Sequence, residues 1–271
     1  MLSRPSEGTQ AVFGASLLPE TAVRAGAVND PAGTHTSRTL MLPEVRGLLG
    51  SCAESATYED YENAAVTHNA VDKGTHATRR KTFRHLRELY GLRSSWLIFR
   101  SLRDLWNFDI SAQPMLAVLC ACARDPLLRV SANVILDYAI GQSVAAHDLA
   151  ESVEEAFPGR YRADTLARCG RNLASSWTQS GHLDGRTNKR RAQTTASIES
   201  TAYGLFLGHI CGLRGDRIFQ SFWARLLDQP GHALRAQAAE ASSRGYLEYR
   251  HAGTVTDIQF GHLSKSPATP Q

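Results

Sequence analysis

Two packed helices are predicted by residues 146–181, and this stretch constrains the fold more than any other part of the chain. In its first part Leu149, Val153 and Phe157 recur at four-residue steps, which is the pattern of a helix with one buried side. The proline and glycine at 158 and 159 end that helix, because neither favours its continuation. A second, longer helix also has an apolar side, formed by Leu166, Cys169, Leu173 and Trp177. The stretch therefore predicts a helix-turn-helix.

The opposite side of the second helix is polar and partly cationic, and its members are Arg168, Arg171, Asn172, Ser175 and Gln179. Such groups hydrogen-bond to base edges and phosphates. The Asp184–Gly185 pair that follows predicts a hairpin turn, and this hairpin carries the cations Arg186, Lys189, Arg190 and Arg191. A helix-turn-helix followed by a basic hairpin is the layout of a winged-helix DNA-binding module. The alternative is an ordinary amphipathic helix whose polar side meets water.

The positive charge of the chain is concentrated in two blocks. Net charge is only +4, yet residues 73–103 hold nine Lys/Arg against one acidic residue, and residues 159–191 hold eight against two. The first block overlaps a second predicted helix-turn-helix, whose last helix buries Phe83 and Leu86 and presents Arg80, Lys81, Arg84 and Arg87 on another side. These four are further candidate DNA-binding residues, with a solvated helix face again as the alternative.

Helical periods through most of residues 39–244 predict an all-α fold of helix-turn-helix and winged-helix modules, with one or two short β-hairpins. The second hairpin is predicted in YLEYRHAGTVTDIQF. The predicted divisions are a disordered extension (1–37), a helix-turn-helix-like module (38–110), central helices with the winged-helix-like module (111–195), a C-terminal helical or winged module (196–260) and a disordered tail (261–271).

The sequence lacks the common catalytic motifs, including the phosphate loop ending in Gly-Lys-Ser/Thr, HExxH and GxSxG. Its ten histidines have no metal-ligand spacing with cysteines or carboxylates. We therefore expect no catalytic residue, no metal and no cofactor. Five cysteines without a CxxC pair are typical of a reducing cytosol, and the longest apolar runs are too short to span a bilayer. The expected location is cytoplasmic.

Four segments together resemble a known family: RTLMLPEVRGLL, NAVDKGTHATRRKTFRHLRELYGL, CARDPLLRVSANVILDYAIG and GRYRADTLARCGRNLASSWTQSGHL. In order and spacing, from about Arg38 to at least Leu183, they are similar to the BrxA (DUF1819) family of small BREX phage-defence proteins. The resemblance implies a helical fold similar to helix-turn-helix DNA binders, acting beside a methyltransferase and other large components that block phage propagation. The family has sometimes been labelled an inner-membrane protein, whereas this sequence has no spanning segment.

The expected function is therefore that of a non-enzymatic component of a BREX-type defence system, with double-stranded DNA and other BREX proteins as partners. The alternative is a protein–protein adaptor that docks the larger defence subunits without touching DNA itself. Binding to DNA that weakens with added salt separates the two. The sequence does not indicate the oligomeric state.

Overall fold

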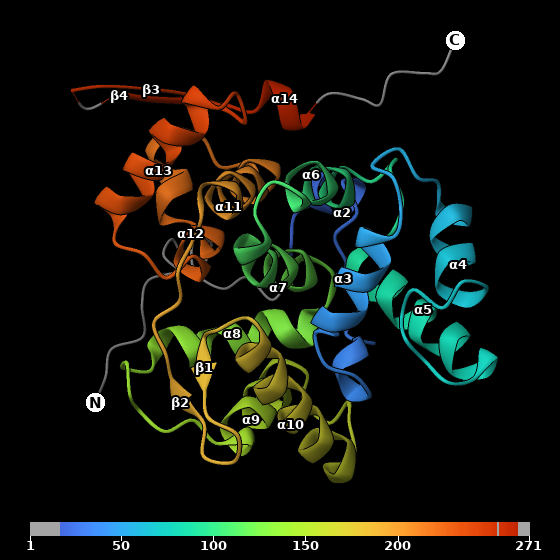
Figure 1. Cartoon of the computed structure of the whole chain (residues 1–271). Coiled ribbons are helices and arrows are strands. Elements are labelled where there is room, and N and C mark those ends of the chain that lie inside the picture. The colour runs from blue at the N-terminus through green and yellow to red at the C-terminus, as the bar shows by residue number, and fades with distance from the viewer. Residues whose placement is uncertain (1–16, 254, 265–271) are drawn as a thin grey trace, which may run out of the picture.

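The computed structural model describes residues 17–253 and 255–264, and this part of the chain is mainly helical with two short antiparallel strand pairs (Figure 1). The predicted fold class is confirmed at this level. The helices before the first strand pair are α2 (Glu20–Arg24), η1 (Thr34–Thr36), α3 (Leu42–Gly50), α4 (Tyr58–Val66), α5 (His76–Tyr90), α6 (Leu97–Trp106), η2 (Ile110–Ala112), α7 (Gln113–Arg124), α8 (Pro126–Asp137), α9 (Ala146–Ala156) and α10 (Ala163–Gln179).

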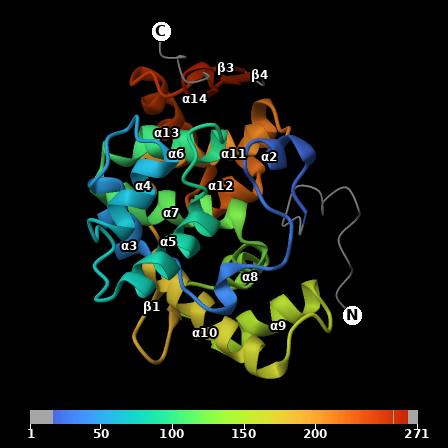
Figure 2. The same ribbon diagram turned by 90° about the vertical axis from the view of Figure 1, so that its right-hand side faces the viewer.

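The first strand pair is β1 (Leu183–Asp184) with β2 (Arg190–Arg191), and the second is β3 (Glu248–Ala252) with β4 (Val255–Gln259). Both predicted hairpins are thus present. Between and after them lie α11 (Ile198–Ile210), η3 (Gly215–Gln220), α12 (Phe222–Leu226), α13 (Gly231–Ser243) and α14 (Gly261–Ser264). The β3–β4 pair and the α9–α10 pair lie at opposite ends of the molecule in both views (Figures 1 and 2).

Helices α7 and α8 occupy the centre of the fold, as their continuous apolar sequence predicts. They meet directly at Asp125–Pro126, where proline begins α8 and the Asp125 carboxylate accepts hydrogen bonds from the N–H groups of Leu127 (2.9 Å) and Leu128 (3.4 Å). α7 contacts α3, α5 and α6 on the N-terminal side, and α8, α10 and α11 on the C-terminal side. Elements from all parts of the sequence therefore share one core.

The prediction that residues 1–37 form a disordered extension is wrong for residues 17–37, while residues 1–16 lie outside the described part. Leu18, Ala22 and His35 are buried. The small side chains in this stretch let its backbone approach two buried guanidinium groups. Arg124 donates to the carbonyl of Gly26, and Arg129 Nη2 donates to that of Val28 (3.0 Å). Hydrogen bonds from distant arginines and the burial of small apolar side chains such as Ala22 together hold the segment in place.

The predicted disordered tail is also corrected for residues 261–264. These residues form α14, which packs against α6 with Leu263 fully buried, and Ser101 Oγ donates to the Leu263 carbonyl (3.1 Å). The rest of the predicted tail, residues 265–271, lies outside the described residues.

A candidate nucleic-acid interface

Helices α9 and α10 pack closely against each other. Gly170 faces the first turn of α9, where a β-carbon would come within 2.1 Å of the Ala146 carbonyl oxygen. Leu149 and Val153 of α9 are buried, as are the α10 residues Cys169, Leu173 and Trp177. The helical phase predicted for both helices is therefore correct.

The predicted basic hairpin follows α10 and is tied to the chain in front of α9. Val144 N–H donates to the Lys189 carbonyl (3.0 Å) and Arg191 N–H donates to the Gln142 carbonyl (2.8 Å), so that Ser143 pairs with Arg190 as a third strand position beside β2. Lys189 Nζ donates to Thr178 Oγ1 of α10 (2.7 Å) and to the Gly185 carbonyl (3.2 Å). These bonds hold the hairpin loop, residues 185–189, against α10.

A groove of about 580 Å³ lies between α10, this loop and the start of α9; we call it the hairpin groove. Arg171 and Ser175 line it from α10, Arg186 and Lys189 line it from the loop, and residues 143–146 close its end. None of its lining residues in the described chain is acidic. Partial burial lowers the pKa of Lys189, and Asp184 opposes this shift. The groove thus gathers three cationic side chains from two elements around one space, where they repel each other unless an anion is present.

Three of the predicted DNA-reading residues on α10 are instead engaged with residues 35–42. Asn172 Nδ2 donates to the His35 carbonyl (2.9 Å), and Arg168 Nε donates to the Thr36 carbonyl (2.8 Å). Gln179 is occupied twice, because its Oε1 accepts from Leu42 N–H (3.0 Å) and its Nε2 donates to Thr39 Oγ1 (3.0 Å). Asn172 and Gln179 are thus half-buried against the N-terminal segment, and their contact with DNA stays a prediction. Arg168 remains exposed beside its bond.

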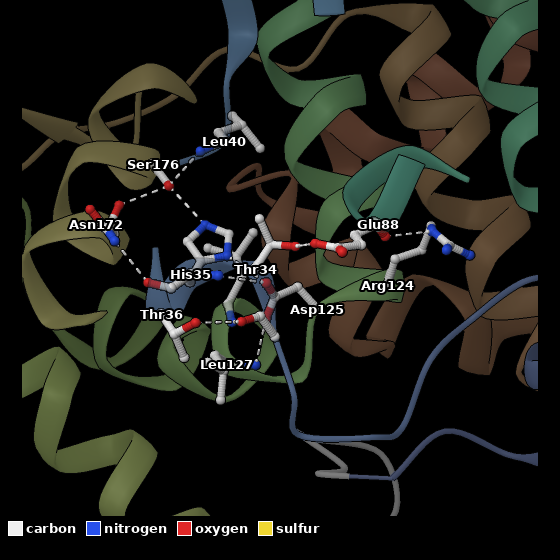
Figure 3. Close-up of polar contacts among 12 residues, drawn as sticks. Thr34, His35, Thr36, Leu40, Glu88, Arg124, Asp125, Leu127, Asn172 and Ser176 are labelled. Atoms are coloured by element: carbon white, nitrogen blue, oxygen red, sulfur yellow. Dashed lines mark hydrogen bonds and ion pairs between the residues drawn. The ribbon is translucent and has the colours of Figure 1, made fainter. Parts of the chain in front are cut away.

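A buried hydrogen-bond relay anchors this N-terminal segment (Figure 3). The two ring nitrogens of His35 lie 2.8 Å from Asp125 Oδ2 and 2.8 Å from Ser176 Oγ. Ser176 Oγ also accepts from Leu40 N–H (2.8 Å) and bonds to the Asn172 carbonyl (2.8 Å). The order Asp–His–Ser has the connectivity of a hydrolytic triad, but all three side chains are buried in the core. The relay therefore fixes the chain on α10.

The charge state of Asp125 agrees with this structural role. Burial by itself raises the pKa of this carboxyl group, but the His35 ring and the backbone N–H groups of His35 and Leu127 outweigh burial and hold the pKa below its ordinary value. Asp125 therefore stays a carboxylate inside the protein. It joins η1 to the start of α8, while Ser176 joins η1 to α10.

Among the hairpin cations, Arg191 is also removed from the candidate interface. Its side chain is buried, its Nη2 lies 2.7 Å from Asp228 Oδ1, and its Nε donates to the Ile135 carbonyl (2.7 Å). Arg186 and Arg190 are exposed, and Arg190 donates to the Gly141 carbonyl (3.0 Å). The run of cations is uniform in sequence, but alternation along β2 turns Arg191 inward and Arg190 outward.

The four cations predicted on α5 are all exposed, whereas Phe83, Leu86, Leu89 and Tyr90 form its buried side as expected. We call Arg80, Lys81, Arg84 and Arg87 the α5 face. They surround a hollow of about 630 Å³ that Tyr58 and Glu62 of α4 complete. In Figure 1 this helix lies at the right and the β1–β2 hairpin at the lower left, with α3 and α10 drawn between them. The structure therefore brings the predicted residues together as two groups, not one.

Comparison with protein-family models and with curated proteins returned no match for this chain. Within residues 17–253 and 255–264, no helix is both long enough and apolar enough to cross a membrane. The same residues contain no cluster of three or more histidine, cysteine or acidic side chains arranged to hold a metal ion.

Proposed function

We propose that this protein binds double-stranded DNA through α10 and the β1–β2 hairpin. The observation that carries the proposal is the hairpin groove, where Arg171, Arg186 and Lys189 converge without an acidic residue in the lining. Three neighbouring cations repel one another, but a phosphate placed between them attracts all three. DNA is the polyanion that a helix beside a basic hairpin commonly binds.

The order of elements supports a winged-helix interpretation of this region. A short strand position at Ser143 precedes α9 and α10, and the β1–β2 hairpin follows and pairs back with Ser143. In this proposal α10 is the recognition helix and the loop 185–189 is the wing. Residues 35–42 cover one side of α10. The residues proposed to contact DNA are Arg171 and Ser175 on its open side, Arg168, which stays exposed beside its bond to the Thr36 carbonyl, and Arg186, Lys189 and Arg190 of the hairpin.

We further propose that the chain is a non-enzymatic, cytoplasmic component of a BREX-type phage-defence system, related to the BrxA (DUF1819) family. The four segments that resemble this family support the assignment. They include α3, α5, the α7–α8 junction and α10. DNA binding suits a component that acts beside a DNA methyltransferase. Other BREX proteins are the proposed protein partners.

A gel shift of the purified protein on duplex DNA at two salt concentrations tests the proposal. The variant R171A/R186A/K189A is expected to bind more weakly than the parent to every duplex. The slope of log K against log salt is expected to decrease by up to about 0.9 for each phosphate that the variant no longer neutralises. The matched control is R24A/R217A/R250A, which removes the same charge from three exposed sites on other elements. Equal affinities and slopes for the groove variant and the parent would contradict the proposal.

One observation favours the adaptor as a second candidate function. A groove of about 680 Å³ between α9 and α10 is lined by small apolar side chains, among them Ala150 and Ala167, and by Glu151, Glu154 and Arg171. Those carboxylates repel phosphates but suit a basic protein segment. An adaptor that acts only through this groove shows no DNA binding at either salt concentration, so the same gel shift separates the two functions.

A further inference from the structure

The α5 face carries four cations with few polar contacts in the fold, namely Arg84 with Glu88 and Arg87 with the Tyr58 hydroxyl. Arg80, Lys81, Arg84 and Arg87 are exposed. Among the described residues, the one carboxylate within ion-pair distance of them is Glu88, whose Oε1 lies 3.8 Å from Arg84 Nε. Glu88 is itself shared, because its other oxygen accepts from Thr34 Oγ1 (2.9 Å) and lies 3.0 Å from His85 Nδ1. Glu62 of α4 also lines the hollow. The face is therefore positive, with four cations against Glu62 and the shared Glu88.

Other arginines close to α5 in sequence or space have clear structural partners. Arg79 Nε donates to the Lys73 carbonyl (3.0 Å) and Arg124 Nε donates to the Glu88 carbonyl (3.0 Å). Arg103 Nη2 donates to the Cys52 carbonyl (2.6 Å). These guanidinium groups satisfy backbone carbonyls in or beside the core. The cations of the α5 face, by contrast, are not needed to complete the packing of this region.

The shape of the face fits an extended polyanion. Arg80, Arg84 and Arg87 follow one side of a straight helix over about 10 Å, from a rise of about 1.5 Å per residue, and Lys81 lies beside them. Arg87 Nη1 is 3.4 Å from the Tyr58 hydroxyl, and the Arg93 guanidinium lies over the Tyr58 ring at 4.9 Å, so α4 supports this side of α5. A row of cations matches a row of backbone phosphates better than it matches one small anion.

We propose that the α5 face is a second binding surface for the phosphate backbone of duplex DNA, separate from the hairpin groove, so that one chain holds two DNA segments. The proposal rests on the proposed function for its first site. The evidence for the second site comes from α5 and does not depend on the hairpin groove. Bridging of DNA is a property that the hairpin groove by itself does not supply.

A two-duplex capture assay tests the proposal. A short biotinylated duplex is fixed to streptavidin beads, the protein is added, and a short fluorescent duplex of the same sequence is supplied in solution. The parent is expected to carry the fluorescent duplex to the beads. The variant R80A/R84A/R87A is expected to remain bound to the beads through the hairpin groove, while captured fluorescence falls at least tenfold. The control R24A/R217A/R250A is expected to capture like the parent.

Every outcome distinguishes the two proposals. If R80A/R84A/R87A captures the fluorescent duplex as well as the parent does, the second surface is excluded and bridging arises from association of chains. If the parent captures none, two-site binding is excluded. If R80A/R84A/R87A loses all DNA while R171A/R186A/K189A binds normally, the α5 face is the main site and the proposed function of the hairpin groove is wrong. Unchanged thermal unfolding of each variant shows that the substitutions act on binding.

Discussion

Replacing His35 with alanine is expected to destabilise the protein by about 3–5 kcal/mol. The imidazole is fully buried and has two hydrogen-bond partners, the Asp125 carboxylate and Ser176 Oγ, each at 2.8 Å. A hydrogen bond to a charged group contributes about 1.5–3 kcal/mol and one to a neutral group about 0.5–1.5 kcal/mol. The cavity left by the ring adds to this loss. Asp125 keeps hydrogen bonds from Leu127 and Leu128 N–H, which limits the effect.

Urea unfolding followed by tryptophan fluorescence measures this effect. The matched control is His76→Ala, because His76 is exposed at the start of α5 and its loss is expected to change stability by no more than about 0.5 kcal/mol. The double variant H35A/D125N removes the stranded carboxylate as well. We expect it to lose less stability than the two single changes added together, with an interaction of about 1–3 kcal/mol. A loss below about 1 kcal/mol for His35→Ala would refute the role assigned to the relay.

Three further predictions follow from buried contacts. A chain that begins at Arg38 lacks His35 and the carbonyls that accept from Arg124 and Arg129, so it is expected to unfold at markedly lower urea than the parent; an unchanged midpoint would contradict the packing of residues 17–37. Gly170→Val places side-chain atoms against the Ala146 carbonyl. It is expected to lower stability by at least about 1–3 kcal/mol, measured by circular dichroism melting, and to weaken DNA binding, measured by the gel shift. Burial lowers the pKa of His182 to about 4, against about 6.5 in an unfolded chain. Between these pH values the unfolded state binds one more proton than the folded state, so the free energy of unfolding falls as pH drops, by about 2 kcal/mol at pH 5. His182→Gln should remove this part of the pH dependence of urea unfolding, and an identical pH profile would refute the assignment.

The sequence predicted the helices well because their signals are local. The apolar side of α10 follows from the spacing of Leu173 and Trp177, and the buried side of α5 follows from that of Phe83 and Leu86. In the same way, the hairpin after α10 follows from its turn residues. Such signals depend on a few neighbouring residues and not on how distant parts of the chain pack.

The candidate site was predicted less well because a polar residue does not reveal its partner. Asn172 and Gln179 have the composition of a DNA-reading face, but their partners lie 137 to 140 residues earlier in the chain. Arg191 resembles Arg190 in sequence, yet Asp228 and the Ile135 carbonyl enclose it. A signal for the covering segment was present in His35 and the apolar Leu40, Met41 and Leu42, but only the fold shows where they pack.

The His35 relay also determines when the N-terminal segment can complete its folding during synthesis of the chain. His35 is made 90 residues before Asp125 and 141 residues before Ser176. At roughly 5–20 residues per second, the last partner is added about 7–28 s after the histidine. Throughout that interval the N-terminal segment, including Leu18 and Leu40, has no completed binding place. The amino-terminal part therefore cannot finish folding while it emerges, because His35 and Leu40 wait for α10, and Thr21 waits for the Ile210 carbonyl of α11.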